Sequence, residues 1–320
     1  MKPVVVTTSP GFGVVGRVPE ALEERGWQFI RCIDTNLADG GLSEHIENAD
    51  FLVVGLIPTT RKTIHLAKKL KAILKHGVGV DNIDIPAATE RKIPVLNTPG
   101  ANANAVAELA VGCMFSLARH IPMVHKVVIE GGWQRYVGTE IQDKTLGIVG
   151  LGNIGKKLAV KAKALGMRVI AHDLYPDHAF MKQHDIELAE LQELLRKADY
   201  VSLHVFGGGK NQSLIGAEEL TSMKKTACVM NFARGDVVDL DALTKALQDG
   251  TIKGAAIDAY VQEPPDRSHP VFSLSNVVFT PHSGADTTES VERVGLMNIE
   301  DIDALLLGER PKRILNPEIY

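Results

Sequence analysis

Two copies of the pattern G-x-G-x-x-G constrain the fold of this chain more than any other feature. One copy, "GFGVVG", begins at Gly11, and the other, "GLGNIG", begins at Gly150. Each follows an apolar run and is followed at the same spacing by an aspartate, Asp34 or Asp173. A glycine turn between a strand and a helix, with an acidic residue at the end of the next strand, is typical of dinucleotide-binding units. The chain therefore contains two candidate nucleotide-binding turns.

Short apolar, β-branched runs alternate with helical patterns along the whole chain. We expect strands near residues 3–7, 28–33, 51–56, 71–75 and 93–96, and a second series near 145–149, 168–172, 200–204, 227–232, 254–258 and 276–280. This alternation predicts an α/β fold with two doubly wound parallel sheets. Thr98-Pro99-Gly100 separates the two series and a long apolar helix follows it. The last helical pattern, about 287–307, ends at Gly308, and the tail after it could return to the first domain.

The second glycine turn fits a nucleotide better than the first. The strand "LGIV" runs directly into Gly150, and a helix can begin around Gly155, so the amide groups at its start can point at phosphates. In the first copy, residues 7–10 lengthen the loop before the glycines, and Pro19 favours a helix that begins there, beyond Gly16. We therefore expect a structural turn at Gly11, Gly13 and Gly16. The cofactor turn is expected at Gly150, Gly152, Asn153, Ile154 and Gly155.

Asp173 indicates which dinucleotide binds. It ends the strand "RVIAHD", where a carboxylate can accept hydrogen bonds from both ribose hydroxyls of the adenosine. A 2'-phosphate at the same place would meet this negative charge, and residues 174–176 contain no arginine to accommodate it. NAD is therefore favoured over NADP.

Composition and charge indicate which partners other than a nucleotide the chain can be expected to bind. With 320 residues the chain is long enough for two domains, and its formal net charge of -4 gives no overall electrostatic reason to expect nucleic acid or an anionic membrane. Cys32, Cys113 and Cys228 are too scattered for a zinc site or a disulfide framework, so we expect no metal and a reducing cytoplasm. The apolar run at the start is too short for a signal peptide, and residues 105–118 fall short of a membrane span.

Polar residues end the successive strands of the second half and so share one edge of its sheet, where ligands bind in parallel α/β folds. Three nearby residues can together reduce a 2-oxo acid: Arg234, Glu263 and His282. Histidine can donate a proton near neutral pH, and a carboxylate bonded to it would favour the imidazolium form and fix the ring. Arginine offers a planar fork for a carboxylate or carbonyl. Taken singly, they also fit a buried ion pair, a solvated loop charge and a capping or core histidine.

The chain resembles the D-isomer-specific 2-hydroxyacid dehydrogenase family over almost its whole length. The resemblance rests on a series of motifs in the same order: "HGVGVDNIDIPAATERKIPVLNTPGANANAVAE", "GLGNIGKKLAVKAKALGMRVIAHD", "NFARGDVVD", "DAYVQEPP" and "TPHSGADT". The phosphoglycerate dehydrogenase and hydroxypyruvate/glyoxylate reductase branches are the most similar. This likeness implies a flavodoxin-like substrate domain from residues 1–99 and 287–320, with a Rossmann NAD-binding domain, residues 100–286, inserted between them.

The resemblance also implies roles for individual residues. Arg234 would bind the substrate, Glu263 would be the partner of the acid/base His282, and Asp258 would lie by the nicotinamide carboxamide. Further cofactor contacts are expected from His204, Ala233 and Gly284. The substrate, a small anionic 2-hydroxy or 2-oxo acid, would be bound by Gly77, Val78, Gly79, Asn102 and Arg234. Successive amides at 77–79 can form an anion-binding nest, although a plain glycine turn is the alternative. The resemblance further implies a homodimer formed through the NAD-binding domain.

Several questions stay open at this level. After His204 the sequence "VFGGGKNQ" departs from the usual family pattern, which puts the contacts of Phe206 and residues 207–209 with the cofactor in doubt. Basic residues around the nest form either a solvated helix face or a surface that steers an anionic substrate, whether phosphorylated or not. These are Arg61, Lys62, Lys68, Lys69, Lys71 and Lys75. Trp133 is expected to pack in the segment used for dimer contacts. The alternatives to an oxo-acid dehydrogenase are a non-catalytic NAD-binding corepressor and a dehydrogenase of formate or phosphite.

Overall fold

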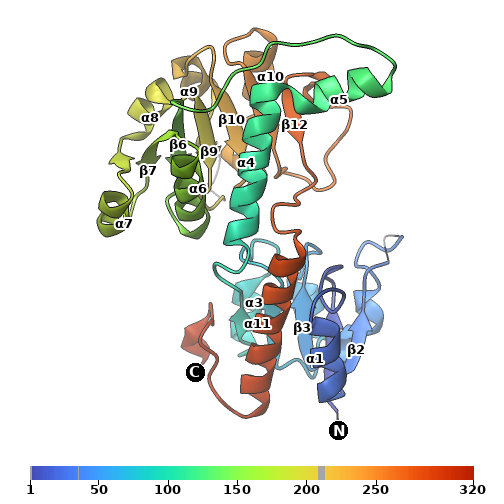
Figure 1. Ribbon diagram of the computed structural model, residues 1–320. Helices are drawn as coiled ribbons and strands as arrows, with labels where there is room; N and C mark the ends of the chain where they lie inside the picture. The colour runs from blue at the N-terminus through green and yellow to red at the C-terminus, as the bar shows by residue number, and fades with distance from the viewer. Residues whose placement is uncertain (1, 35, 208–212) are drawn as a thin grey trace. The chain divides into compact units, whose positions relative to one another are not determined.

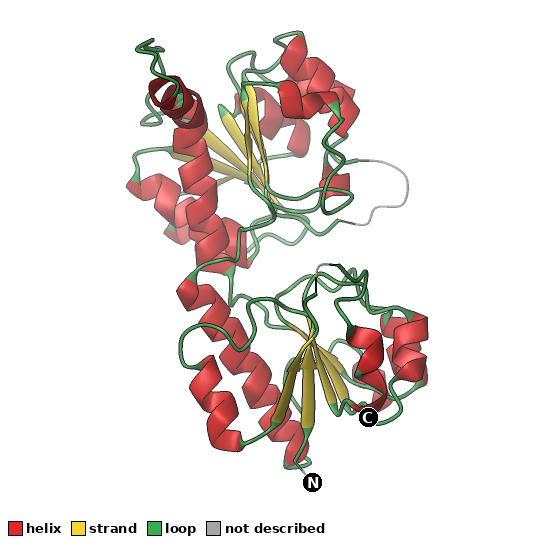
Figure 2. Ribbon diagram, turned by 90° about the vertical axis from the view of Figure 1, so that its right-hand side faces the viewer, coloured by secondary structure: helices red, strands yellow, loops and turns green. Residues whose placement is uncertain are grey.

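Figure 1 shows the chain as a computed structural model, which describes residues 2–34, 36–207 and 213–320. The chain forms two compact units, Met1–Asn102 with Ala285–Tyr320, and Ala103–Gly284. The boundaries expected at 99/100 and 286/287 lie close to these divisions. Each unit has strands between layers of helices (Figure 2). Gly208 and Gly209, which belong to the loop expected to depart from the family pattern, lie outside the described residues.

The first unit has a five-stranded parallel sheet with the order β2-β1-β3-β4-β5. This is the flavodoxin-like order expected for this unit. The strands are β1 (Val4–Thr7), β2 (Gln28–Arg31), β3 (Phe51–Val54), β4 (Ala72–Lys75) and β5 (Val95–Leu96). The helices are α1 (Val18–Arg25), α2 (Arg61–Leu66), α3 (Ile85–Glu90) and α11 (Thr288–Leu306).

The central strands of this sheet are continuous apolar runs because both of their faces are buried. On one face Val6, Leu52 and Val54 pack with Ile64 and Ala87. On the other face are Val5, Phe51, Val53 and Leu74, together with Phe12, Ile299 and Ile302. The C-terminal helix α11 is therefore part of the core of the first unit.

The tail after α11 returns to the same unit, as the sequence suggested. Ile314 forms an antiparallel bridge with Leu96 at the edge strand β5. The buried side chain of Asn316 accepts a hydrogen bond from the Val95 amide at 2.8 Å and donates one to the Ile93 carbonyl at 2.9 Å. These bonds satisfy backbone groups at the edge of the sheet that would otherwise lack partners.

The first glycine copy lies in a loop before α1, as predicted, but α1 begins at Val18 and not at Pro19, which is inside its first turn. Proline suits either of the first two helical positions, because the backbone N–H groups of the first turn have no acceptor within the helix. Gly13 and Gly16 have positive φ angles, 76° and 62°. Between the glycines, Phe12 is fully buried and packs edge-on against Phe29 and His76. The loop thus contributes the side chain of Phe12 to the core of the first unit.

The second unit has a seven-stranded parallel sheet with the order β12-β11-β10-β9-β6-β7-β8. From β6 this is the doubly wound order 3-2-1-4-5-6, extended by one strand. The strands are β6 (Thr145–Val149), β7 (Arg168–His172), β8 (Glu187–Leu188), β9 (Tyr200–Leu203), β10 (Cys228–Asn231), β11 (Gly254–Ile257) and β12 (Val277–Phe279). The sequence did not predict β8, since its two exposed residues form no apolar run.

Seven α-helices of this unit lie in the described part of the chain. They are α4 (Ala103–Arg119), α5 (Ile121–Ile129), α6 (Asn153–Ala164), α7 (His178–Gln183), α8 (Leu191–Lys197), α9 (Ala217–Ser222) and α10 (Leu240–Gln248). The helix α4 packs closely against α6.

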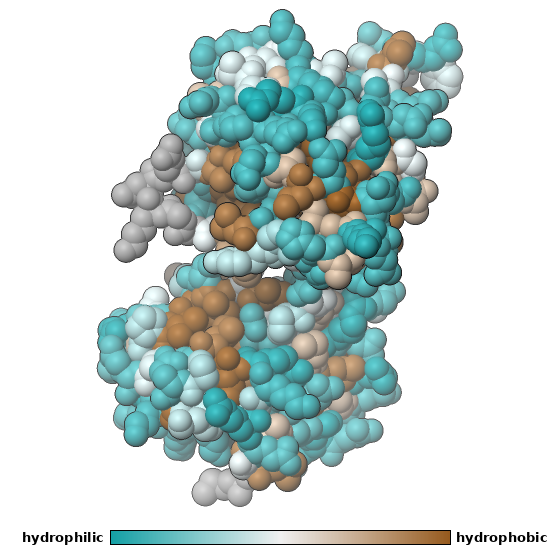
Figure 3. All heavy atoms as spheres, turned by 90° about the vertical axis from the view of Figure 1, so that its left-hand side faces the viewer, coloured by the Kyte–Doolittle hydropathy of each residue, from teal (hydrophilic) through white to brown (hydrophobic). Residues whose placement is uncertain are grey.

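Figure 3 shows a face of the molecule that is mostly hydrophilic, with apolar patches. None of the described helices combines the length and the apolar character needed to span a membrane.

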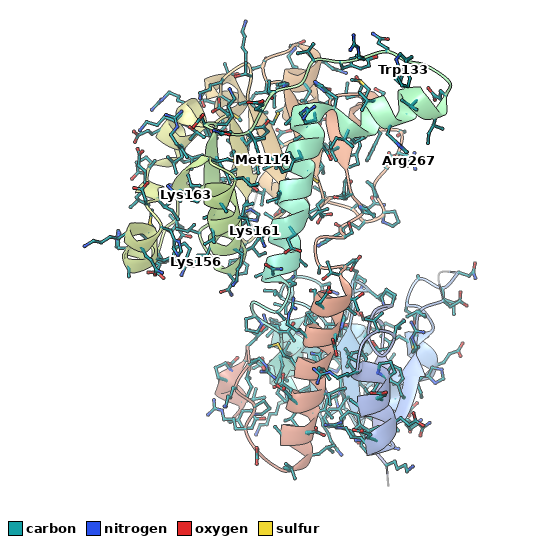
Figure 4. All side chains as sticks on the ribbon, viewed as in Figure 1. Met114, Trp133, Lys156, Lys161, Lys163 and Arg267 are labelled. Atoms are coloured by element: carbon teal, nitrogen blue, oxygen red, sulfur yellow. The ribbon has the colours of Figure 1, made fainter. Side chains whose placement is uncertain are left out.

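Three lysines of α6 form ion pairs with acids from other segments of this unit. Figure 4 labels Lys156, Lys161 and Lys163, which come from this helix. Each is paired with an acid: Lys156 with Asp177 at 2.6 Å, Lys161 with Glu108 at 3.1 Å, and Lys163 with Asp185 at 2.9 Å. These local pairs leave little net positive charge to attract a polyanion.

Candidate functional site

The second glycine turn has a different requirement at each of its three glycines. Gly150 has a φ of 94°, and a Cβ there would lie 2.6 Å from the carbonyl oxygen of His204. A Cβ on Gly155 would lie 2.2 Å from the carbonyl oxygen of Gly150, so this glycine lets α6 pack tightly on the turn. At Gly152 a Cβ would meet no atom of the described residues within 4 Å. The middle glycine therefore faces open space, where a ligand can approach the backbone.

The start of α6 leaves amide groups free for an anion. The helix begins at Asn153, with Gly152 as its N-cap, and its first intrahelical bond runs from the Lys156 amide to the Gly152 carbonyl. Among the described residues, no acceptor is bonded to the amides of 152–155. Free amides at a helix start carry the positive end of the helix dipole, and they suit a pyrophosphate. Gly150, Gly152, Asn153, Ile154 and Gly155 therefore fit the phosphates of a dinucleotide.

Asp173 is held next to this turn, as its spacing predicted. Its Oδ2 accepts a hydrogen bond from the Leu151 amide at 2.6 Å, and its Oδ1 accepts one from the Tyr175 amide at 2.8 Å. The carboxylate thus ties the end of β7 to the glycine turn at the end of β6. A carboxylate has further lone pairs on both oxygens, which remain able to accept ribose hydroxyls.

Asp258 organises the loops that follow β11 and β12. It is 4% exposed, and its Oδ1 accepts hydrogen bonds from the Thr280 hydroxyl at 2.7 Å and the Ser283 amide at 2.9 Å. Its Oδ2 accepts a bond from the Gly284 amide at 3.1 Å. Buried side-chain oxygens need hydrogen-bond donors such as these to replace those of water. Asp258 therefore fixes the turn that carries His282.

His282 and Glu263 form a pair at the same edge of the sheet. Nδ1 of His282 lies 2.7 Å from Oε1 and 2.8 Å from Oε2 of Glu263. His282 has a φ of 54°, which is uncommon for a residue with a side chain. Burial works against ionisation of Glu263, but hydrogen bonds from His282 and the Tyr260 amide, with the charges of His282 and Arg234, outweigh it and lower its pKa. The glutamate is thus an ionised partner of Nδ1 that orients the imidazole, and Nε2 lies on the other side of the ring.

Arg234 follows β10 on a loop packed against the loop of Glu263. A Cβ on the next residue, Gly235, would lie 2.1 Å from the backbone of Tyr260, so only glycine allows this approach. Asn231 holds the turn: its Nδ2 donates to the Arg234 carbonyl at 2.8 Å, and its Oδ1 accepts from the Ala233 amide at 3.1 Å. Gly207 is close to the stem of Arg234, since a Cβ there would lie 2.5 Å from the Cβ of the arginine.

His204 lies beneath the glycine turn and is electrically neutral. Burial lowers the pKa of His204 to about 3. Its Nε2 lies 2.8 Å from the Ser202 hydroxyl, and its ring stacks on Phe232. Its Nδ1 is buried without a protein partner among the described residues. An unpaired polar atom at this edge is one place where a ligand could make a hydrogen bond.

Two features of the first unit lie at residues expected to bind the substrate. The carbonyl of Gly77 accepts bonds from the amide and hydroxyl of Thr98, both at 2.9 Å, and the Val78 carbonyl accepts one from the Asn97 side chain at 2.8 Å. Within the described chain, the amides of residues 77–79 have no protein acceptor. Oδ1 of Asn102 is likewise buried without a partner in that part of the chain. Amides without acceptors can bind an anion.

A family model for the NAD-binding domain of D-isomer specific 2-hydroxyacid dehydrogenases matches residues 111–284. The chain belongs to this family. It is 41% identical over 288 residues to a D-3-phosphoglycerate dehydrogenase of Methanocaldococcus jannaschii, which covers 89% of this chain and 55% of that protein. A glyoxylate reductase of Korarchaeum cryptofilum is 37% identical over 86% of this chain and 85% of its own length. This member of the family thus spans about half the length of the first relative and most of the second.

A solved structure agrees with the family assignment. The D-lactate dehydrogenase from Aquifex aeolicus, complexed with NAD and lactic acid, is 25% identical to this 2-hydroxyacid dehydrogenase family member. The two share a TM-score of 0.84 over 98% of this chain and 99% of that chain. The family model that matches this chain is itself that of an NAD binding domain, and the glycine turn with free amides at 152–155 fits the phosphates of such a cofactor.

Supporting residues of this dehydrogenase fold were missed by sequence reasoning. Asn231 holds the Arg234 turn, and Tyr260 donates its hydroxyl to the carbonyls of Ile257 at 3.2 Å and Thr280 at 3.0 Å. Thr280 in turn bonds to Asp258. The only sequence signal for these residues was their position at strand ends. That signal is weak, because ordinary polar residues also end strands.

Proposed function

We propose that this protein is an NAD-dependent oxidoreductase that interconverts a small D-2-hydroxy acid and its 2-oxo acid. One observation carries the proposal: the His282–Glu263 pair lies at the same sheet edge as the NAD turn. A histidine held by an ionised glutamate is an arrangement suited to proton exchange with a substrate oxygen. The relatives named as dehydrogenases and reductases support an enzyme over a non-catalytic corepressor.

Each site residue has a role in this proposal. NAD, when bound, supplies or accepts the hydride. We assign proton exchange to Nε2 of His282, orientation of its ring to Glu263, and binding of the substrate carboxylate or carbonyl to Arg234. In the first unit, the amides of residues 77–79 are assigned to the substrate carboxylate and Asn102 to a neighbouring substrate atom.

The remaining cofactor assignments concern the second unit. We assign the pyrophosphate to the Gly150–Gly155 turn and the adenosine ribose to Asp173. His204, Ala233, Asp258 and Gly284 are assigned to the nicotinamide side. For Asp258 the support is its place between β11 and β12, where it also holds the His282 turn.

We further propose a cytoplasmic homodimer formed through the second unit, without nucleic acid as a partner. None of the residues of α5 is buried, and apolar side chains are exposed at the end of this helix and in the segment after it. Ile129 is 71% exposed, Trp133 86% and Val137 97%. Large exposed apolar groups of this kind are typical of subunit interfaces. Light scattering on the purified protein tests this, with a dimer expected and a monomer contradicting it.

The catalytic proposal is tested by NADH consumption with a panel of 2-oxo acids. The panel contains hydroxypyruvate, glyoxylate, pyruvate, phosphohydroxypyruvate and oxaloacetate, each assayed under the same conditions. Turnover of at least one of them is expected. Tight NADH binding without turnover of any member would contradict the proposal and favour a non-catalytic NAD-binding protein.

A further inference from the structure

The three free amides of residues 77–79 belong to three peptide groups that are held in different ways. A peptide group is planar, so the direction of each amide is set by the carbonyl of the preceding residue. The Gly77 carbonyl, which shares a peptide with the Val78 amide, accepts two bonds from Thr98. The Val78 carbonyl, which shares a peptide with the Gly79 amide, accepts a bond from the Asn97 side chain. These bonds fix the directions of the second and third amides.

The first amide, that of Gly77, lacks a bond of this kind. It shares its peptide with the His76 carbonyl, and among the described residues no donor is bonded to that carbonyl. Gly77 has a φ of 142°, in a region that favours glycine, so local sterics restrict this peptide only weakly. The direction of the Gly77 amide must therefore be held by another contact, and the side chain next to it is that of His76.

The ring of His76 is enclosed by the first glycine copy and by α11. Its Nδ1 lies 3.0 Å from the hydroxyl oxygen of Ser9. Phe12 packs edge-on against it, with 5.7 Å between the ring centroids. A Cβ on Gly11 would lie 3.5 Å from Cε1 of the imidazole and 3.2 Å from a methyl group of Val291 in α11. The loop that carries the glycines thus approaches the ring closely.

The segments that hold this ring are themselves anchored. The hydroxyl of Thr7 donates to a carbonyl of β3 at 3.0 Å and accepts the Ser9 amide at 3.0 Å, which ties Ser9 to the sheet. The carbonyl of Lys75, the residue before His76, accepts a bond from Nδ2 of the buried Asn298 in α11 at 3.1 Å. His76 is therefore fixed through its side chain and through the residue that precedes it.

His76 is an expensive residue to bury at this place. Burial and the charge of Lys75 lower the pKa of His76 to about 4, and the Val291 backbone opposes them only in part. Its Nε2 is buried and makes no hydrogen bond of ordinary geometry within the described chain. An apolar side chain could fill the same space without a polar atom left unpaired. The bond between Nδ1 and Ser9 is what distinguishes the histidine from such a residue.

We propose that His76 is a positioning residue that directs the Gly77 amide toward the substrate carboxylate, and that the first glycine copy forms the loop that holds its ring. The inference rests on the proposed function, which assigns the amides of residues 77–79 to that carboxylate. His76 acts through the peptide that it shares with Gly77 and does not touch the substrate. The first G-x-G-x-x-G pattern then serves the substrate and not a nucleotide, because Gly11 and Phe12 pack against the imidazole.

Steady-state kinetics with the best 2-oxo acid of the panel test this role. His76→Ala should raise KM for the acid, and the inhibition constant of the carboxylate analogue oxamate, by about tenfold, the effect of weakening one hydrogen bond to a charged group. Its kcat and NADH affinity should change by less than about threefold, since the lost interaction is one of binding. His76→Asn keeps an amide group near the position of Nδ1, where it can bond to Ser9, and should recover part of the lost affinity. The matched control Ile302→Val, at a fully buried residue of the same unit, should leave KM unchanged.

The amides themselves can be followed by NMR with glycine labelled with ¹⁵N. Oxamate added to the NADH complex of the wild-type protein is expected to shift the signals of both Gly77 and Gly79. In His76→Ala the shift at Gly77 should be largely lost, and the shift at Gly79 should persist because its peptide keeps the bond to Asn97. Ser9→Ala removes only the hydroxyl and should have the same effect in weaker form. A merely structural role for His76 would reduce both shifts alike.

The outcomes separate this inference from the proposed function. Unchanged KM in a folded His76→Ala protein, or in Ser9→Ala where the former does not fold, would overturn the inference and leave the dehydrogenase proposal intact. An equal rise in KM in Ile302→Val would also overturn it, because the effect would then be a general loosening of the unit. NADH binding by the wild-type protein without turnover of any 2-oxo acid would overturn both proposals.

Discussion

The hydroxyl of Thr280 donates a 2.7 Å hydrogen bond to Oδ1 of Asp258, and this bond joins the loop after β12 to the end of β11. The same carboxylate accepts the amides of Ser283 and Gly284, on the other side of His282. The turn that carries the proposed acid/base histidine is therefore held from both sides by one buried aspartate.

Asp258→Asn should disturb this turn. The variant places an NH₂ group where one carboxylate oxygen accepts a hydrogen bond, so two donors face each other. We expect a loss of about 1–3 kcal/mol in the free energy of unfolding and a fall of about 100-fold in kcat, typical of a small misplacement of a catalytic group. Thr280→Val removes one of the three bonds and should have a smaller effect on both quantities. Equal effects in the two variants would contradict this account.

Glu263→Gln should change how stability depends on pH. The pKa of Glu263 is lowered in the folded protein, so its ionised form stabilises the fold above the ordinary glutamate pKa of about 4.3. That contribution is lost as the pH falls through the lowered pKa. Denaturant unfolding at several pH values should therefore show the variant less stable than the wild type at neutral pH, with the difference shrinking in acid. A difference that grows in acid would reverse the sign and refute the assignment.

Two glycines of the NAD turn should respond differently to alanine. Gly155→Ala places a Cβ against the Gly150 carbonyl, and the resulting overpacking should cost about 1–3 kcal/mol of stability. In Gly152→Ala the new Cβ meets no atom of the part of the chain that the structure describes, so the melting temperature should stay near the wild-type value while the affinity for NADH falls. Gly112→Ala, in α4 with open space around it, controls for the general effect of alanine. Unchanged NADH affinity in Gly152→Ala would place the phosphates elsewhere.

Asp173→Ala should weaken the preference for NAD. The change removes the proposed ribose acceptor and leaves the amides of Leu151 and Tyr175 without their carboxylate partner. We expect at least about a tenfold loss of NADH affinity, equivalent to about 1.4 kcal/mol, and a smaller loss for NADPH. Asp185→Ala, at a 98% exposed side chain, should change neither. Parallel losses for both cofactors would show that Asp173 does not discriminate between them.

Much of the fold could be predicted from the sequence because both sheets are buried on two faces. Their strands read as short apolar runs, and each predicted range contains an observed strand, while β8 among the described strands was not predicted. The sequence also contained grounds for choosing between the two glycine turns. The loop before Gly11 and the position of Pro19 indicated that the first copy does not lie at a helix start, and α1 indeed begins beyond Gly16.

Other features depended on tertiary contacts that leave no local signal. The start of α1 at Val18 was missed because proline fits either of the first two helical positions. Nothing in "LKHG" distinguishes a buried Lys75 from an exposed one. Of its two partners, Gly55 is distant in sequence and Asn82 follows the turn. The positive φ of His282 and the support from Asn231 likewise arise from the packing of neighbouring loops.

The most direct test of the central claim is NADH oxidation by His282→Ala with the best 2-oxo acid of the panel. NADH binding, measured by fluorescence titration, should stay near the wild-type value, and kcat should fall by about 10² to 10⁴. His178→Ala, at an exposed histidine of the same unit, should retain full activity. Near-normal NADH oxidation by His282→Ala would contradict the proposed role of the His282–Glu263 pair.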